Sequence, residues 1–190
     1  MRSASVFITG LIAVVCFSTA CFHTPEYKKE FKHVTKKGRV FNYNTWDANI
    51  IWNATFFSDE FRQEFAKEHA KLNNMEPLES ARWMATQGMA QQDNWEFLIS
   101  IYTKEEYDHF SMNPDSFWKI ILTTEDGEII HPVAIEKMHN DPYAQVMFDY
   151  VDRWTDIYKI LFPKVNLGKS FSLTLHSVVG QSTLKWKLSK

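Results

Sequence analysis

Two residues near position 140 are the strongest candidates for catalytic or metal-binding chemistry in this chain. His139 and Asp141 stand two positions apart, directly before Pro142. An imidazole beside a carboxylate can hold a metal ion or transfer a proton near neutral pH. An Asp before a Pro is also typical of a helix N-cap, and we favour this structural role. We therefore predict no catalytic residue, no metal site and no cofactor, and keep His139 and Asp141 as weak candidates.

A second group of metal-ligating residue types lies between positions 64 and 69. Glu64, Glu68 and His69 do not match the H-E-x-x-H spacing of zinc helices. We expect an exposed, charged helix face instead. The chain also lacks the G-x-S-x-G elbow, the P-loop and the G-x-G-x-x-G pattern. These absences make an enzyme the least favoured class of function.

Cys21 is the residue whose position predicts the most specific chemistry. Arg2 gives a positive start, Val6–Phe17 is an apolar run, and small residues occupy positions 18–20. This order is that of a secretory signal peptide, which we place at residues 1–20. The apolar run is shorter than the ~20 residues needed to span a bilayer, so we do not favour an uncleaved membrane helix.

The small residues before Cys21 resemble the lipobox of bacterial lipoproteins. The resemblance implies cleavage before Cys21, a diacylglycerol on its thiol and an acyl chain such as palmitate on its new amine. Ser18 stands where that family usually has a large aliphatic residue. Ser18 and Ala20 also suit ordinary signal peptidase, so a plain secreted protein is the alternative. Cys16 would leave with the signal, and lipidation explains why the mature chain would keep a single cysteine.

The residue after Cys21 bears on localisation. It is Phe22, whereas Asp at this place resembles the inner-membrane retention signal of enteric-type Gram-negative bacteria. The resemblance therefore implies the periplasmic face of the outer membrane. In a Gram-positive host the same anchor would display the domain on the outer face of the cell membrane. We expect membrane contact through the anchor and a protein partner in the cell envelope. The net charge of -2 gives no reason to expect nucleic acid.

Residues 21–45 are expected to be the lipidated N-terminus followed by a basic tether. Six basic residues stand against two glutamates there: Lys28, Lys29, Lys32, Lys36, Lys37 and Arg39 against Glu26 and Glu30. This composition is typical of a solvated linker, and it can also attract anionic lipid headgroups. We expect one globular domain over 46–190, and a chain starting near Phe41 that folds without detergent.

Alternating apolar residues predict most of that domain to be strands. The predicted strands are 49–57, 95–102, 117–124, 128–137, 156–162, 169–177 and 182–188. Asp126-Gly127 predicts a hairpin that pairs 117–124 with 128–137. Pro132 marks the second of these as an edge strand or a bulge. We expect Trp52, Trp95, Trp118 and Trp186 to be buried on inward strand faces.

Helical patterns interrupt the strands. Ser58 predicts an N-cap for a helix that ends at Asn73-Asn74, and Pro77 predicts the start of the next. Leu78, Ala81, Ala85 and Met89 form the predicted apolar stripe of this second helix. A short helix is expected from Thr103 to Phe110. Residues 139–154 fit either a helix beginning at Asp141 or an irregular aromatic loop.

The expected fold class is mainly β, of the α+β type. Strand hairpins with few strand-helix-strand units predict an antiparallel β-sandwich, with the helix pair at about 58–90 as an insertion. The strand pattern with Trp118 and Trp186 resembles an immunoglobulin-like sandwich, although the Cys-Trp-Cys signature is absent.

Two non-catalytic functions remain. The first is a lipid-anchored binding or assembly module that acts through an exposed strand edge or the helix-pair surface. The alternative is a periplasmic carrier or sensor with an aromatic pocket for an apolar small ligand. A closed apolar cavity would favour the alternative, and an exposed apolar patch would favour the module.

Overall fold

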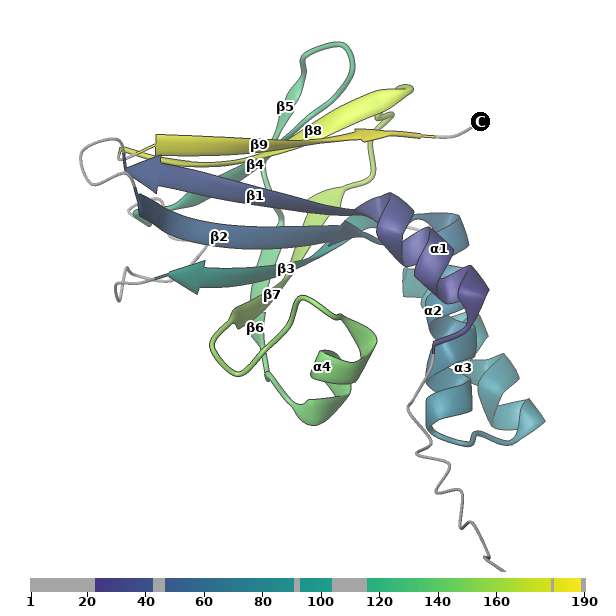
Figure 1. Ribbon diagram of the computed structural model, residues 1–190. Helices are drawn as coiled ribbons and strands as arrows, with labels where there is room; N and C mark the ends of the chain where they lie inside the picture. The colour runs from purple at the N-terminus through teal and green to yellow at the C-terminus, as the bar shows by residue number, and fades with distance from the viewer. Residues whose placement is uncertain (1–22, 43–46, 91–92, 104–115, 179, 189–190) are drawn as a thin grey trace, which may run out of the picture.

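The computed structural model describes residues 23–42, 47–90, 93–103, 116–178 and 180–188 (Figure 1). Nine strands in these ranges form two antiparallel sheets. The five-stranded sheet has the order β1 (Thr35–Asn42), β2 (Asp47–Phe56), β3 (Asn94–Thr103), β7 (Asp156–Pro163), β6 (Ala134–Met138). The four-stranded sheet has the order β5 (Ile129–Ile130), β4 (Lys119–Thr123), β8 (Ser170–Ser177), β9 (Gly180–Lys187). The prediction of a mainly β, α+β chain is confirmed.

Apolar residues that alternate along the strands form the core between the two sheets. Every second side chain from Ile50 to Phe56 is buried, as the period of two predicts. The Phe56 ring lies 4.9 Å from that of Phe171 on β8. Trp52 Nε1 donates a hydrogen bond of 3.0 Å to Ser182 Oγ on β9. The two sheets therefore pack face to face, in a sandwich-like arrangement.

Three of the four tryptophans predicted to be buried lie in this core. Trp52, Trp118 and Trp186 are buried. Trp95 is only partly buried, because its indole Nε1 reaches the carbonyl oxygen of Val165, 2.9 Å away, at the rim of the sheet. The aromatic residues thus serve mainly as large core side chains.

The outer face of the five-stranded sheet is covered as well. It packs against α1 (Pro25–Val34) and against the segment around α4 (Pro142–Met147) (Figure 1). Phe31 of α1 stacks on Tyr150 with ring centres 5.8 Å apart, and the Tyr150 hydroxyl lies 2.7 Å from Oγ1 of the buried Thr55 on β2. The central strands are therefore buried on both faces.

The predicted helix pair is confirmed as α2 (Asp59–Leu72) and α3 (Pro77–Ala90). Ser58 is the N-cap of α2, since its hydroxyl accepts a hydrogen bond of 3.2 Å from the backbone N of Phe61. Figure 1 shows α1, α2 and α3 gathered at one end of the sheets. They form the helical end of the molecule.

The expectation that residues 22–45 form an extended tether is wrong for the described residues from Pro25 to Asn42. Thr24 caps α1, Pro25 occupies its first turn, and Tyr27, Phe31 and Val34 are buried along one face. The strand β1 then pairs with β2 along its whole length. The basic residues that suggested a linker are mostly the exposed sides of a helix and a strand.

The predicted strand 128–137 is two strands in different sheets. Asp126-Gly127 makes the expected turn, with Gly127 at φ 86°, and β5 pairs with β4 over two residues. Pro132 then ends the pairing because it has no N–H to donate. The chain crosses to the other sheet, where β6 pairs with β7. Pro132 thus separates two edge strands.

Residues 139–154 contain the helix α4, which Asp141 caps, and then an aromatic loop. Both readings of this stretch hold in part. Thr103, the expected start of a short helix, is the last residue of β3, and the rest of that helix falls on residues outside the described ranges.

Candidate functional site

Asp141 caps the helix α4, and His139 lies just before it on the surface. Asp141 Oδ1 accepts a hydrogen bond of 2.8 Å from the backbone N of Ala144, which confirms the N-cap, and His139 is exposed. Within the described ranges no three His, Cys, Asp or Glu side chains lie close enough together to hold a metal ion. Cys21 lies outside the described residues.

Glu68 of α2 binds the first two described residues of the chain. Its side chain is fully buried. Its Oε2 accepts hydrogen bonds from the backbone N and the hydroxyl of Thr24, at 3.3 and 3.0 Å. Its Oε1 lies 3.2 Å from His23 Nδ1 and 3.4 Å from Lys71 Nζ. We call His23, Thr24, Glu68 and Lys71 the Glu68 clamp, and for Glu68 the predicted exposed charged face is wrong.

The Glu68 clamp keeps its carboxylate ionised. Burial by itself raises the pKa of the Glu68 carboxyl, but the hydrogen bonds from Thr24 and His23 and the charge of Lys71 outweigh burial and lower the pKa below its ordinary value. The other ring nitrogen of His23 is also engaged. Its Nε2 lies 2.7 Å from the carbonyl oxygen of Val146 in α4. The first described residues of the chain are therefore fixed to both α2 and α4.

His69, one residue further along α2, connects three helices. Its ring stacks on that of Trp83 in α3, with centres 4.3 Å apart, and its Nδ1 contacts the hydroxyl of Tyr143 in α4. Burial lowers the pKa of His69 and raises the pKa of Tyr143. Both groups are therefore uncharged near pH 7. Their contact packs α2, α3 and α4 together at the helical end.

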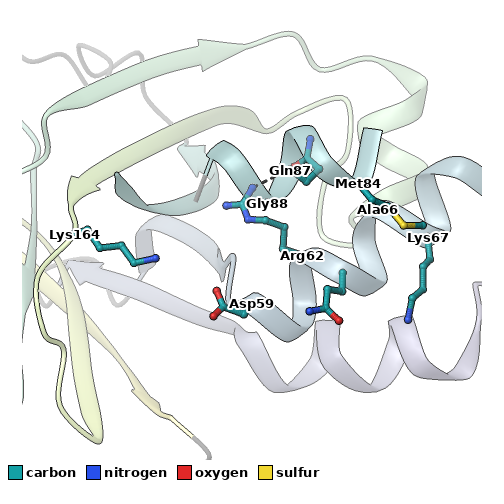
Figure 2. A pocket seen from close by; sticks show the side chains of 9 residues that line it. Asp59, Arg62, Ala66, Lys67, Met84, Gln87, Gly88 and Lys164 are labelled. Carbon is teal, nitrogen blue, oxygen red and sulfur yellow. Dashed lines mark hydrogen bonds between the residues drawn. The ribbon is translucent and has the colours of Figure 1, made fainter. Parts of the chain in front are cut away.

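An open groove of about 530 Å³ lies between α2 and α3 (Figure 2). Arg62 reaches from α2 into its wall and is only 3 % exposed. Its guanidinium pairs with Glu96 Oε2 at 2.9 Å, donates to Gln87 Oε1 at 3.2 Å and lies over the Phe57 ring. Among the described residues its Nε has no hydrogen-bond partner. This N–H is buried in the wall of the groove, so the groove offers polar groups through its exposed lining residues.

The charges along this groove balance one another. Lys67 and Lys164 also line it, but Lys67 pairs with Glu64 at 2.6 Å and the groove contains Asp59. This lining suits a polar ligand better than an apolar one. No role for Arg62 could be predicted from sequence, because its partners Gln87 and Glu96 lie 25 and 34 residues further along the chain.

The outer face of α3 is apolar and exposed. Leu78 and Met89 are 65 % and 68 % exposed, and Ala81 and Ala85 between them are exposed as well. The partly buried residues of α3 are instead Ser80, Trp83 and Gln87, at the same three- and four-residue spacing on the opposite side. The predicted apolar stripe therefore exists, and it faces solvent rather than the core.

The outer sheet edges are poorly suited to pairing with another strand. β5 has two residues, and the five-residue β6 follows Pro132 and carries Glu136 and Lys137. Short strands, proline and charges are typical devices that block edge-to-edge pairing. At the other side of the sandwich, β1 and β9 lie next to each other (Figure 1). The helical end therefore offers the more accessible surface.

No helix of the described ranges is long and apolar enough to cross a membrane. Comparison with protein-family models, with curated proteins and with solved structures finds no match to this chain.

Proposed function

We propose that this chain is a lipid-anchored protein of the cell envelope that acts as a non-catalytic binding or assembly module, with the α2–α3 pair as its binding surface. The observation that carries the choice of surface is the exposed apolar face of α3. An isolated exposed apolar residue needs no explanation, but a continuous stripe along a helix is typical of an interaction site. The groove beside it, lined by Asp59, Lys67 and Lys164, adds a polar binding element.

The anchor is proposed from the sequence around Cys21, and the fold suits it. Only Phe22 separates Cys21 from His23, which the Glu68 clamp fixes to α2. An acyl group on Cys21 would thus be attached almost directly to the folded domain. We place the protein at the periplasmic face of the outer membrane, since Phe22 is not the retention signal Asp.

We also keep the immunoglobulin-like relationship as a proposal. Two antiparallel sheets that bury Trp118 and Trp186 between them are compatible with it. The strand order β1-β2-β3-β7-β6 begins with three consecutive strands. At Pro132 the chain passes from the four-stranded sheet to the five-stranded sheet. The proposal concerns this sandwich-like core and not the helical end.

Fractionation of the native host tests the anchor. The wild-type protein should sediment with outer-membrane markers, and a Cys21→Ser variant should be lost from that fraction. Mass spectrometry of the mature wild-type N-terminus should find acyl chains on Cys21. An unmodified Cys21, or equal solubility of the two proteins, would disprove the lipid anchor and the localisation together.

Crosslinking tests the binding surface. A photoreactive residue at Ala85 of α3 should form adducts in intact cells, whereas the same residue at the exposed Gln181 of β9 should form far fewer. Equal adduct formation at the two positions would show that the α2–α3 pair is not the preferred surface.

A further inference from the structure

We propose that the outer face of α3 rests on the lipid surface of the membrane that carries the anchor. This inference rests on the proposed acylation of Cys21 and names the partner of one of the two binding elements. The groove at Arg62 would then stay open to polar ligands beside the membrane.

The first support is that α3 leaves an apolar stripe in solvent. An ordinary surface helix turns its apolar stripe to the core and its charges to water. In α3 the packed side is Ser80, Trp83 and Gln87, whereas the stripe from Leu78 to Met89 faces outward. The whole helix contains one acidic and one basic residue, Glu79 and Arg82. Contact with lipid lowers the free energy of an apolar face of this kind, whereas exposure to water raises it.

The second support is the position at which the chain leaves the described structure. Two residues span at most about 7 Å, so an acylated Cys21 lies within about 7 Å of His23. His23 is bound to Glu68 in the last turns of α2, and α2 leads through a short turn to Leu78 at the start of α3. The acyl chains would therefore enter the bilayer beside the beginning of the stripe.

The dimensions of the stripe fit a helix lying in the membrane interface. Leu78 and Met89 are eleven positions apart, which is about 16 Å along a helix. Interfacial helices bury their apolar face about 5–10 Å into the boundary between headgroups and acyl chains. Two large side chains bind lipid weakly by themselves. An anchor at Cys21 makes their insertion intramolecular, so weak contacts suffice.

The composition of the stripe favours lipid over a protein partner. Protein interfaces are centred on Trp, Tyr or Arg anchors in fitted pockets. The four stripe residues are two alanines, a leucine and a methionine, on the convex surface of a single helix. These side chains fit a fluid apolar phase without any complementary shape.

The test uses the single-cysteine character of the mature chain. Once Cys21 is acylated, a cysteine at Ala85 would be the only free thiol, because Cys16 belongs to the signal. The acylated Ala85→Cys protein is purified, labelled with a nitroxide and placed in vesicles of phosphatidylethanolamine and phosphatidylglycerol. The matched control carries Gln181→Cys on β9, also an exposed position. Collision of the label with oxygen and with a water-soluble nickel complex is then measured by electron paramagnetic resonance.

Lipid contact predicts that the label at position 85 collides several-fold more with oxygen, relative to the nickel complex, than the label at position 181. Adding Met89→Glu should return the label at position 85 toward the control value. A label at position 85 that behaves as the control does, in protein that floats with the vesicles, would overturn the lipid contact and leave the anchor standing. Low collision with both reagents would mean that a protein or a second copy covers α3, and would overturn it too. Protein that does not float would overturn the anchor and this inference together.

Discussion

At the residue scale, Glu68 shows how a charged side chain becomes structural. In the sequence it stands among charged residues of a helix, next to His69 and near Glu64, and nothing local distinguishes it. Its partners His23 and Thr24 precede it by 45 and 44 residues, so only the fold brings them together. A buried carboxylate is stable when its oxygens accept hydrogen bonds from several donors, and Glu68 has four such contacts.

Replacing Glu68 by Gln tests the Glu68 clamp. The amide keeps the size of the side chain but loses its charge and turns an N–H₂ group toward the donors of Thr24 or His23. We expect the free energy of unfolding to fall by about 1.5–3 kcal/mol, as for other hydrogen bonds to charged groups. Urea unfolding measures this change.

The control for this prediction is Glu64→Gln. Glu64 pairs with Lys67 at the surface of the same helix, and an exposed pair of this spacing contributes about 0.5 kcal/mol or less. Equal losses in the two variants would contradict a structural role for the Glu68 clamp.

The pKa shifts of His69 and Glu68 predict that the protein loses stability in acid. His69 has a lowered pKa in the folded state, so below its ordinary value of 6.5 the unfolded chain binds a proton that the folded chain does not. Glu68 has a lowered pKa as well, so a further loss begins as the pH falls below 4.5. The free energy of unfolding should therefore be highest near neutral pH and decrease in two stages.

Urea unfolding at pH 7.5, 5.5 and 4 checks this profile, with His69→Asn and Glu68→Gln as reporters. His69→Asn should reduce the first loss and Glu68→Gln the second. A wild-type profile that stays flat from pH 7.5 to 4 would show that neither shift is present.

At the element scale, the sequence predicted which segments form strands and helices better than it predicted what covers them. The strands β2 and β3 carry large apolar residues at alternate positions, which is typical of a strand with one face in the core, so Trp52 and its neighbours were identified correctly. The stripe of α3 has an equally regular pattern, yet Leu78 and Met89 are exposed. Periodicity shows that a helix has an apolar side, but it does not reveal what that side contacts.

Two other elements show the same limit. Pro132 predicted an interruption, and the sequence carries no information on which sheet takes the chain afterwards, since both sheets offer an open edge. In α1, Tyr27, Phe31 and Val34 give a helical pattern, but the surrounding lysines give the segment the composition of a linker. The groove at Arg62 could not be predicted either, because its walls come from α2, α3 and the chain after β7.

Two glycines test the packing of these elements, because one is crowded by side chains and the other has open space around it. A Cβ on Gly38 of β1 would lie 2.7 Å from Ser182 Oγ and still closer to the Trp52 indole, which crosses this position. Gly38→Ala should therefore lower the free energy of unfolding by about 1–3 kcal/mol. Gly88 of α3 has open space around it, so Gly88→Ala should raise the free energy of unfolding by about 0.5–1 kcal/mol.

Thermal unfolding of the two variants compares them directly. The expected signs are opposite, and a common sign would mean that the contacts around Gly38 or the helical state of Gly88 are not as described.

At the scale of the whole molecule, the N-terminal segment is part of the fold and not an appendage to it. Tyr27, Phe31 and Val34 of α1 belong to the core, and so does Val40 of β1. The membrane, if Cys21 is acylated, would therefore lie against the helical end of the molecule rather than at the end of a flexible linker. This arrangement restricts how the domain can tilt.

Truncation tests whether the N-terminal segment is integral. A chain beginning at Phe41 would lose four buried side chains, each of which contributes about 1.5–3 kcal/mol. That loss rivals the whole net stability of a domain, about 5–15 kcal/mol, so this chain should show no cooperative thermal unfolding. The sequence alone predicts instead that a chain starting near Phe41 folds without detergent. A chain beginning at Phe22 keeps α1 and β1 and should unfold cooperatively without detergent.

Near-ultraviolet circular dichroism during heating distinguishes the two chains. A sigmoidal transition in the chain that begins at Phe41 would show that α1 and β1 are dispensable.

The hydrogen bond from Trp186 Nε1 to the carbonyl oxygen of Val34 joins residues 152 positions apart, at 2.6 Å. β9, the last strand of the described residues, thus completes the packing of α1. A ribosome or an export channel releases the N-terminus first. Trp186 therefore becomes available to α1 only after nearly the entire polypeptide has emerged. Until then, Phe31 and the inner faces of the early strands lack part of their cover. We expect the final packing of α1 to be a late step of folding, because contacts of long sequence separation form slowly. Apolar surface left exposed during that interval would favour aggregation.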